Sequence, residues 1–269
     1  MNYTAITSFN KTLFDEYGHR MVDSFLKFWP QDIDLWIYAE DFTANFQDPR
    51  IKVIDMNQIE NLLAFKERHK NNPKAHGNGT NFKFDAVRFC HKVFSIAHAC
   101  TNKESGWVIW VDGDVVTHSP VTYGFIKGVS PEVCNITYLG RSRTKNYSEC
   151  GWVGYNISKE LTLDFVDHFE GLFVSDKVFD LKEWHDSYVF DEVRKVFEKN
   201  PEFTAYDLGM TCPDYAARSN HIFINSVLGK CFDHQKGARK KTQVNKRGDL
   251  LNKDFFDHPY WAKQLKNAK

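Results

Sequence analysis

Residues 107–119, WVIWVDGDVVTHS, contain a run of apolar, β-favouring residues that is interrupted by two aspartates around a glycine. The first five residues predict a buried strand, because tryptophan, valine and isoleucine favour packed, pleated surfaces. Asp112 and Asp114 follow at the end of this run, and residues two apart on a strand point to the same side. Buried carboxylates need compensating partners, and a divalent cation is the strongest one available. The stretch therefore predicts a metal site at the end of a buried strand.

Strand-like and helix-like segments alternate on both sides of this stretch. The strands are predicted at 3–9, 34–41, 51–56, 107–116, 135–140 and 149–158. The helices are predicted from apolar residues at helical spacing, at 14–30, 57–70, 82–101, 158–173 and 185–199. This alternation is typical of an α/β domain with a mainly parallel sheet flanked by helices. Residues 201–269 look less regular, and we expect them to close over the carboxyl edge of the sheet, where such folds bind ligands.

Composition limits the class of protein. Apolar residues make up 42% of the 269, which argues against disorder. The 35 Lys and Arg residues balance the 35 Asp and Glu residues, so the surface as a whole is not built for nucleic acid. The sequence has no apolar run of membrane-spanning length, no signal pattern at its start and no Cys-x-x-Cys pair. We therefore expect a cytoplasmic protein, with residues 1–247 as one domain and 248–269 as a helical tail packed on it.

The Asp-x-Asp spacing alone is weak evidence for a metal. With 22 aspartates in the chain, roughly two such matches are expected by chance, and two occur. The other, Asp32-Ile33-Asp34, precedes its strand in the turn after Pro30, where a turn or capping role is the better interpretation. Only the pair after the buried strand needs a metal.

A second motif, in CFDHQKGARKK at 231–241, supplies a third ligand. His234-x-x-Gly237-x-x-Lys240 is a more specific pattern than the aspartates. An imidazole can complete a Mn²⁺ site begun by two carboxylates. Gly237 can offer a backbone N–H to a phosphate, and Lys240 and Arg239 can neutralise it. Together the two motifs favour a metal-bound diphosphate.

These two stretches resemble the glycogenin and galactosyltransferase-like group of GT-A glycosyltransferases. The resemblance implies a GT-A, Rossmann-like nucleotide-diphospho-sugar transferase fold, a donor that is usually a UDP-sugar, and Mn²⁺ or Mg²⁺ between its diphosphate and the protein. It implies Asp112, Asp114 and His234 as metal ligands, and Gly237 and Lys240 as pyrophosphate contacts. The chain departs from the group after Lys240, where Lys241 and Thr242 replace the usual Pro-Trp.

Further candidate site residues follow from the same resemblance. Arg88 lies on the helix before the aspartates, in the place of a basic residue that steadies the donor, although a solvated helix face explains it equally well. Ser8 and Asn10 end the first strand, where such folds hold the base and ribose. Tyr17 is a candidate for stacking on uracil, with a plain core role as the alternative.

Two carboxylates are candidate catalytic groups. Glu149 begins a strand, ECGWVGYN, that resembles the one lining the sugar and acceptor pocket. Asp186 lies in the first turn of the helix predicted at 185–199. An acidic residue there can also have the purely structural role of stabilising the start of the helix. An inverting transferase needs one such base for the acceptor hydroxyl, whereas a retaining one does not. The resemblance favours retention.

The acceptor and the enzyme class leave alternatives open. Residues 229–247 hold seven Lys or Arg against one Asp, and a plain solvated loop is the better interpretation of that charge. The alternative is that the basic loop 236–247 contacts DNA with hydroxylated bases. A glycan or lipid-linked glycan is the favoured acceptor. The alternatives to a hexosyl- or pentosyltransferase are a metal-dependent nucleotidyltransferase or other phosphoryl-transfer enzyme, and a non-catalytic module that binds nucleotide sugars.

Overall fold

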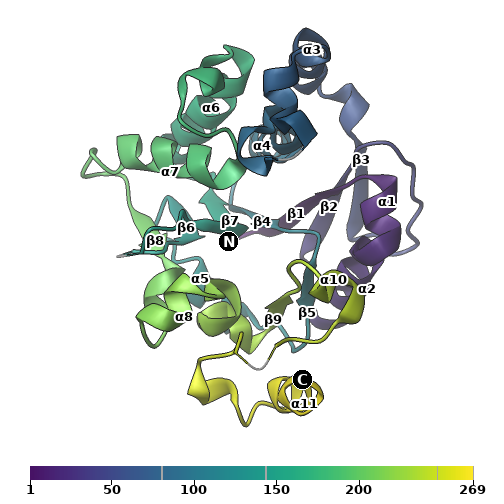
Figure 1. The fold of residues 1–269 in the computed structure, drawn as a ribbon, viewed down its shortest axis with the longest axis vertical. Helices are drawn as coiled ribbons and strands as arrows, with labels where there is room; N and C mark the ends of the chain where they lie inside the picture. The colour runs from purple at the N-terminus through teal and green to yellow at the C-terminus, as the bar shows by residue number, and fades with distance from the viewer. Residues whose placement is uncertain (80, 143, 247, 269) are drawn as a thin grey trace.

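A seven-stranded sheet forms the centre of the molecule in a computed structural model that describes residues 1–79, 81–142, 144–246 and 248–268 (Figure 1). The strands lie in the order β3-β2-β1-β4-β7-β6-β8. Their bounds are β1 Tyr3–Phe9, β2 Asp34–Ala39, β3 Ile51–Asp55, β4 Trp107–Val111, β6 Ile136–Leu139, β7 Glu149–Asn156 and β8 Ala205–Asp207. Neighbouring strands are parallel except β7, which is antiparallel to β4 and β6. The prediction of a mainly parallel α/β sheet is confirmed.

Helices lie on both faces of the sheet, and each face has its own apolar core. One core receives side chains from α3 (Glu60–His69), α4 (Ala86–Thr101), α6 (Glu160–Val174) and α7 (Asp186–Phe197). The other receives them from α2 (His19–Phe28), α5 (Tyr123–Val129), α8 (Tyr215–Ser219), α9 (Ile222–Asn225) and α11 (Pro259–Asn267). Figure 1 shows the first set above the sheet and the second set below it. Burial on both faces explains the continuous apolar sequence of the central strands.

The strand predicted at 107–116 is interrupted, because the chain leaves the central sheet at the aspartates. β4 ends at Val111, and a turn leads through Asp112 and Asp114 to β5 (Val115–Thr117). β5 then pairs antiparallel with β9 (Phe232–His234) in a separate two-stranded sheet, where Val115 is opposite His234. Because of this pairing, the two sequence motifs come together.

Gly113 is required at this turn. A Cβ atom on Gly113 would lie 2.2 Å from the ring of Phe9, at the end of the neighbouring strand β1. Any side chain would therefore push the aspartates away from the sheet edge.

Two other segments differ from the prediction. The helix predicted at 14–30 is built from α1 (Lys11–Leu13), a π-helical stretch over Phe14–Gly18, and α2, which ends before Pro30. The region predicted to be irregular, 201–269, contains β8, β9, α8, α9, α10 (Arg239–Thr242) and α11. Trp261 of α11 is fully buried and donates its indole N–H to the Gly229 carbonyl at 2.7 Å. In the part of the chain described, no helix is both long and apolar enough to cross a membrane.

Candidate functional site

Asp112, Asp114 and His234 meet at the carboxyl end of β4, and one ligand atom from each lies within 4.8 Å of the others. His234 Nε2 is 3.0 Å from Asp114 Oδ1 and 3.7 Å from Asp112 Oδ2. Two carboxylates and one imidazole form a donor set that suits Mn²⁺ or Mg²⁺. The residues predicted as metal ligands therefore fit a divalent cation.

Asp114 is buried and carries its charge between two basic groups. Burial acts to raise the pKa of Asp114, but His234 and Lys240 outweigh it and hold that pKa below its ordinary value. Lys240 Nζ lies 3.0 Å from Asp114 Oδ2. The late motif thus contributes two side chains to one carboxylate, and Lys240 marks the side from which an anionic ligand would approach.

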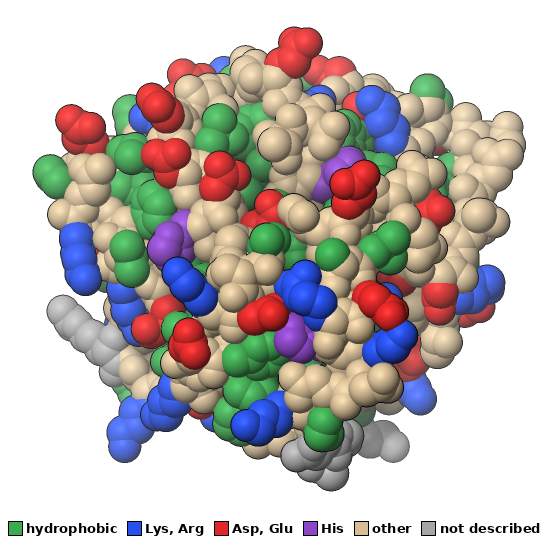
Figure 2. Space-filling view, turned by 90° about the horizontal axis from the view of Figure 1, so that it is seen from above, with side chains coloured by type: hydrophobic (Ala, Val, Ile, Leu, Met, Phe, Trp, Pro, Cys, Tyr) green, Lys and Arg blue, Asp and Glu red, His purple; other side chains and the backbone are tan. Residues whose placement is uncertain are grey.

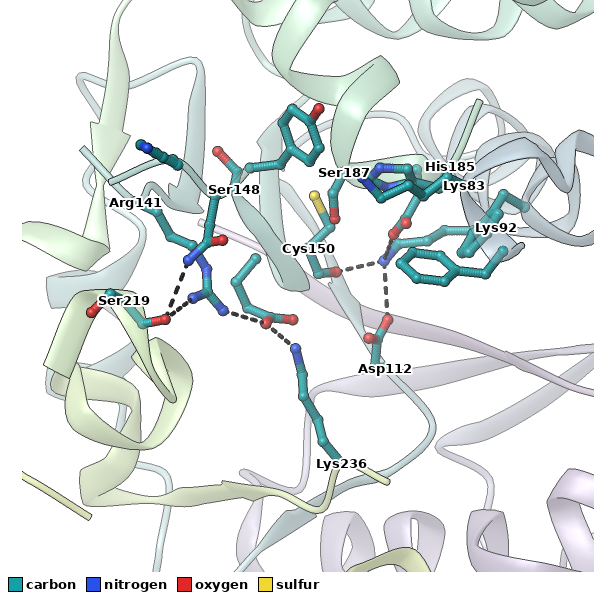
Figure 3. Close-up of a pocket in the computed structure, with 17 residues that line it drawn as sticks. Lys83, Lys92, Asp112, Arg141, Ser148, Cys150, His185, Ser187, Ser219 and Lys236 are labelled. Carbon is teal, nitrogen blue, oxygen red and sulfur yellow. Dashed lines mark hydrogen bonds and ion pairs between the residues drawn. The ribbon is translucent and has the colours of Figure 1, made fainter. Parts of the chain in front are cut away.

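Lys92 of α4 is a buried cation that joins three parts of the site (Figure 3). Its Nζ lies 3.0 Å from Asp112 Oδ1, 2.8 Å from Asp186 Oδ2 and 2.5 Å from the Cys150 carbonyl oxygen. Burial would lower the pKa of Lys92, but the two carboxylates raise it above its usual value. Asp186 is correspondingly held ionised, because Lys92 outweighs the effect of burial on its pKa.

Glu149 begins β7 and is buried behind the imidazole of His234. Its Oε1 lies 3.7 Å from His234 Nδ1, and its Oε2 contacts Lys236 and, at 3.3 Å, Arg141 (Figure 3). Burial acts to raise the pKa of Glu149, but Lys236 and His234 hold it well below its usual range. Glu149 is therefore an ionised carboxylate enclosed by cations, which makes it a poor acceptor for a proton.

Two hollows flank the candidate metal site. One, of about 640 Å³, is lined by Ser8, Asn10, Tyr17, Glu40, Lys66, Arg88, Asp112, Asp114 and Lys240, among others. The other, of about 660 Å³, is lined by Phe82, Arg141, Tyr147, Glu149, His185, Asp186 and Lys236, among others. Phe89, Lys92 and Asp112 line both. The two hollows therefore meet at Lys92 and Asp112. We name the first the donor hollow and the second the acceptor hollow, after the contacts expected from the sequence.

Four residues expected to contact the donor nucleotide line the donor hollow, namely Ser8, Asn10, Tyr17 and Arg88, but two of them have other partners. Asn10 Oδ1 accepts the Leu13 backbone N–H at 2.8 Å, so it caps the first helix. Tyr17 is only 7% exposed, and Lys240 Nζ lies 4.7 Å from its ring centroid, so the ring supports this lysine and exposes little surface for stacking. Ser8 and Arg88 remain open to a ligand at the end of β1 and the start of α4.

Arg239 does not occupy the place that the sequence predicted. Its buried guanidinium donates to the His234 carbonyl oxygen at 2.9 Å and contacts His221 and Asn245. It therefore fixes the loop after β9 from the inside and is not free to neutralise a phosphate. Gly237, with a positive φ of 60°, lines a smaller hollow beside this loop instead of the donor hollow.

Sequence reasoning missed the roles of Lys92, Lys236 and Glu40. Lys92 lies within the helix predicted at 82–101, and valine, phenylalanine and isoleucine follow it at 93, 94 and 96. That apolar run was the available signal, because α4 is almost entirely buried from residue 92 to residue 97. Nothing in the sequence indicates the partners of Lys236 or Glu40.

Comparisons with solved structures identify the fold. No model of a known protein family matches the sequence, and no curated protein matches it significantly. The glycosyltransferase GlyE of Streptococcus pneumoniae TIGR4 is similar with a TM-score of 0.55 at 10% identity, over 99% of this chain and 63% of that one. This chain thus spans less than two thirds of GlyE. An active-site mutant of LgtC is similar with a TM-score of 0.50 at 11% identity, over 84% and 83% of the two chains.

Mouse xyloside xylosyltransferase 1 gives a TM-score of 0.49 at 11% identity, over 79% of this chain and 87% of that one. The likeness to GlyE and LgtC shows that the chain has the GT-A glycosyltransferase fold, as the sequence motifs predicted.

Proposed function

We propose that this chain is a metal-dependent glycosyltransferase that moves a sugar from a UDP-sugar to a hydroxyl acceptor with retention of configuration. The observation that carries the proposal is the cluster of Asp112, Asp114 and His234 between two hollows on a GT-A fold. A GT-A fold alone does not fix an activity, so the proposal rests on the chemistry of this site.

The donor would lie with its nucleoside in the donor hollow and its diphosphate at Asp112, Asp114 and Lys240. A divalent cation held by the two aspartates and His234 would supply positive charge to the leaving diphosphate. Lys240 adds a cation at the same place, and Arg88 lines the hollow next to it. Lys92 holds Asp186 at the boundary of the hollows, where the sugar would bridge them. These charges are fixed before the reaction, so they stabilise the transition state without reorganising.

Retention is favoured by the state of the carboxylates in the acceptor hollow. Its acidic lining residues among those described are Asp112, Asp186 and Glu149, and each is paired with a cation. Glu149 and Asp186 are ionised carboxylates whose pKa values are held below the ordinary range, so both are weak general bases. In a retaining reaction, the acceptor oxygen bonds to the anomeric carbon as the bond to the diphosphate breaks. The hydroxyl proton then passes to the departing phosphate oxygen, so no protein base is needed.

A neutral glycan or glycolipid suits the acceptor hollow better than nucleic acid. Most described basic side chains of the loop 236–247 already have carboxylate partners, in the pairs Lys236–Glu149, Arg239–Asp233, Lys240–Asp114 and Lys241–Glu16. Arg247, which was predicted to extend this basic loop, lies outside the described residues. Figure 2 shows acidic and basic side chains mixed on the face seen from above, without a broad basic patch. Phosphate backbones bind where positive charge is left unpaired.

The test is nucleotide release from a panel of UDP-, GDP- and CMP-sugars with Mn²⁺, with and without EDTA. We expect UDP and free or transferred sugar to form only with the metal present. Release of UMP would instead indicate phosphoryl transfer. Binding of a UDP-sugar without turnover, even with a panel of glycan acceptors, would indicate a binding module.

Glu149 is assigned to orienting His234. If His234 Nε2 binds a cation together with the two aspartates, the ring proton is on Nδ1, and Nδ1 is a buried atom without a hydrogen-bond partner among the described residues. Glu149 is the carboxylate on that side of the ring, at 3.7 Å. Carboxylates behind a metal-bound histidine fix its tautomer and raise its affinity for the metal.

The Glu149→Gln variant is therefore expected to bind Mn²⁺ roughly 10- to 100-fold more weakly and to regain transfer at saturating Mn²⁺. Metal binding is measured by electron paramagnetic resonance, and the tautomer by ¹⁵N NMR of the imidazole. Lys236→Met is the matched control, because it removes the cation beside Glu149 and keeps the carboxylate. Unchanged Mn²⁺ affinity with transfer abolished at every Mn²⁺ concentration would instead make Glu149 the base predicted from the sequence.

A further inference from the structure

The donor hollow is also lined by a second group of ionisable side chains, Glu40, Lys66 and His91. Glu40 follows β2, and its backbone N–H donates to the Phe9 carbonyl at the end of β1 at 2.9 Å. Since β1 lies between β2 and β4, Glu40 is two strand spacings, roughly 10 Å, from Asp112. That span corresponds to a ribose and a base extending from a diphosphate. Glu40 is therefore placed where the base of a bound nucleotide would end.

The carboxylate of Glu40 has no hydrogen-bond partner among the described residues, although its side chain is only 18% exposed. One neighbour is His91, whose Nδ1 lies 3.7 Å from Glu40 Oε2. Burial raises the pKa of Glu40 to about 7, and Lys66 only partly opposes that effect. Burying a carboxylate without a hydrogen-bond partner lowers the stability of the fold. Glu40 is therefore a hydrogen-bond acceptor that a bound ligand could satisfy.

The neighbours of Glu40 are donors. Lys66 Nζ lies 3.1 Å from His91 Nε2. Because an ammonium group can only donate, His91 Nε2 accepts, and the ring proton is on Nδ1, facing Glu40. Burial lowers the pKa of His91 to about 4, so the ring is neutral. The cluster of Glu40, Lys66 and His91 therefore presents one acceptor with N–H donors beside it.

We propose that Glu40 reads the base of the donor nucleotide by accepting the N3–H of uracil; this rests on the proposed function. The pairing edge of uracil is an N–H beside oxo groups, which matches an acceptor with a donor beside it. Cytosine places a lone pair at N3, which a carboxylate repels. Guanine has an N–H but places an amino group beside it, which Lys66 opposes. Reading a base at this edge discriminates through the hydrogen bonds that the wrong base leaves unmade.

The test compares the binding of UDP, N3-methyl-UDP, 2′-deoxy-UDP and CDP in the presence of Mn²⁺ by calorimetry at pH 8.5. Wild-type protein is expected to bind N3-methyl-UDP and CDP roughly 10- to 100-fold more weakly than UDP. In Glu40→Ala, UDP and N3-methyl-UDP should bind within about threefold of each other, because the charged hydrogen bond is gone. The loss on removing the 2′-hydroxyl should be the same in both proteins. Glu40→Gln, which keeps the shape, and Asp41→Asn, an exposed neighbour outside the hollow, serve as controls for folding and for nearby charge.

Three results would overturn the inference. If wild type binds UDP and N3-methyl-UDP equally, Glu40 does not read the base, and the proposed transferase stands. If Glu40→Ala removes the sensitivity to the 2′-hydroxyl instead, Glu40 holds the ribose. If no UDP or UDP-sugar binds in the presence of Mn²⁺, the proposed function itself fails.

Discussion

Sugar transfer by the Asp114→Asn variant is expected to fall roughly 1,000-fold, because a metal contributes several kcal/mol to transition-state stabilisation. The amide keeps the shape of the aspartate but removes a buried charge that lies beside His234 and Lys240. Without that charge the cation binds weakly, and Lys240 loses its partner. Transfer rates and Mn²⁺ binding by electron paramagnetic resonance measure the two effects in one protein.

The chain supplies a matched control in its other Asp-x-Asp pair. Asp34 begins β2, at the opposite end of the sheet, and forms a half-exposed ion pair with Lys52 at 3.2 Å. Asp34→Asn should leave transfer and Mn²⁺ affinity unchanged. Wild-type Mn²⁺ affinity in Asp114→Asn would remove the basis for a metal site at the end of β4.

The Lys92→Met variant is expected to lose roughly 3 kcal/mol of unfolding free energy, because it leaves the nearly buried Asp186 and the partly buried Asp112 without their shared cation. Asp112 and Asp186 would then repel each other across the boundary of the two hollows. Transfer should fall as well, since Asp186 would no longer be held in place. Urea unfolding monitored by tryptophan fluorescence gives the stability, and the nucleotide-release assay gives the activity.

Two further variants test the cause of this loss. Lys92→Met combined with Asp186→Asn should recover part of the stability, because it removes one of the repelling charges. Lys83→Met changes a lysine in the same hollow that is 42% exposed and paired with Glu183, and it should cost less than about 1 kcal/mol. Equal losses of unfolding free energy in Lys83→Met and Lys92→Met would show that the three contacts of Lys92 do not stabilise the fold more than an ordinary surface ion pair.

The fold was largely readable from the sequence because its signals are local. The apolar run at 107–111 predicted β4, and the spacing of apolar residues over 82–101 predicted the helix that contains α4. Where local signals were mixed, prediction weakened. Nothing within β5 or β9, three residues each, indicates that they pair with each other far along the chain.

The candidate metal ligands were also readable, but the roles of the surrounding charges were not. Asp112, Asp114 and His234 belong to two motifs with fixed spacing, and such motifs can be recognised in the sequence alone. Arg239 and Lys240 stand side by side in the same motif, yet one faces the interior and the other faces Asp114. Spacing gives no means to tell them apart.

The sequence by itself determined most strands of the central sheet, the long helices and the types of candidate ligand at the end of β4, because propensity, periodicity and side-chain chemistry belong to the residues themselves. Only the tertiary structure decided that Lys92 joins Asp112 to Asp186 and that Glu149 lies behind His234. It also decided that the Glu40 carboxylate has no hydrogen-bond partner among the described residues. The physical reason is that the state of a charge depends on its burial and on its neighbours. Those neighbours come from segments 20 to 94 residues away in the chain.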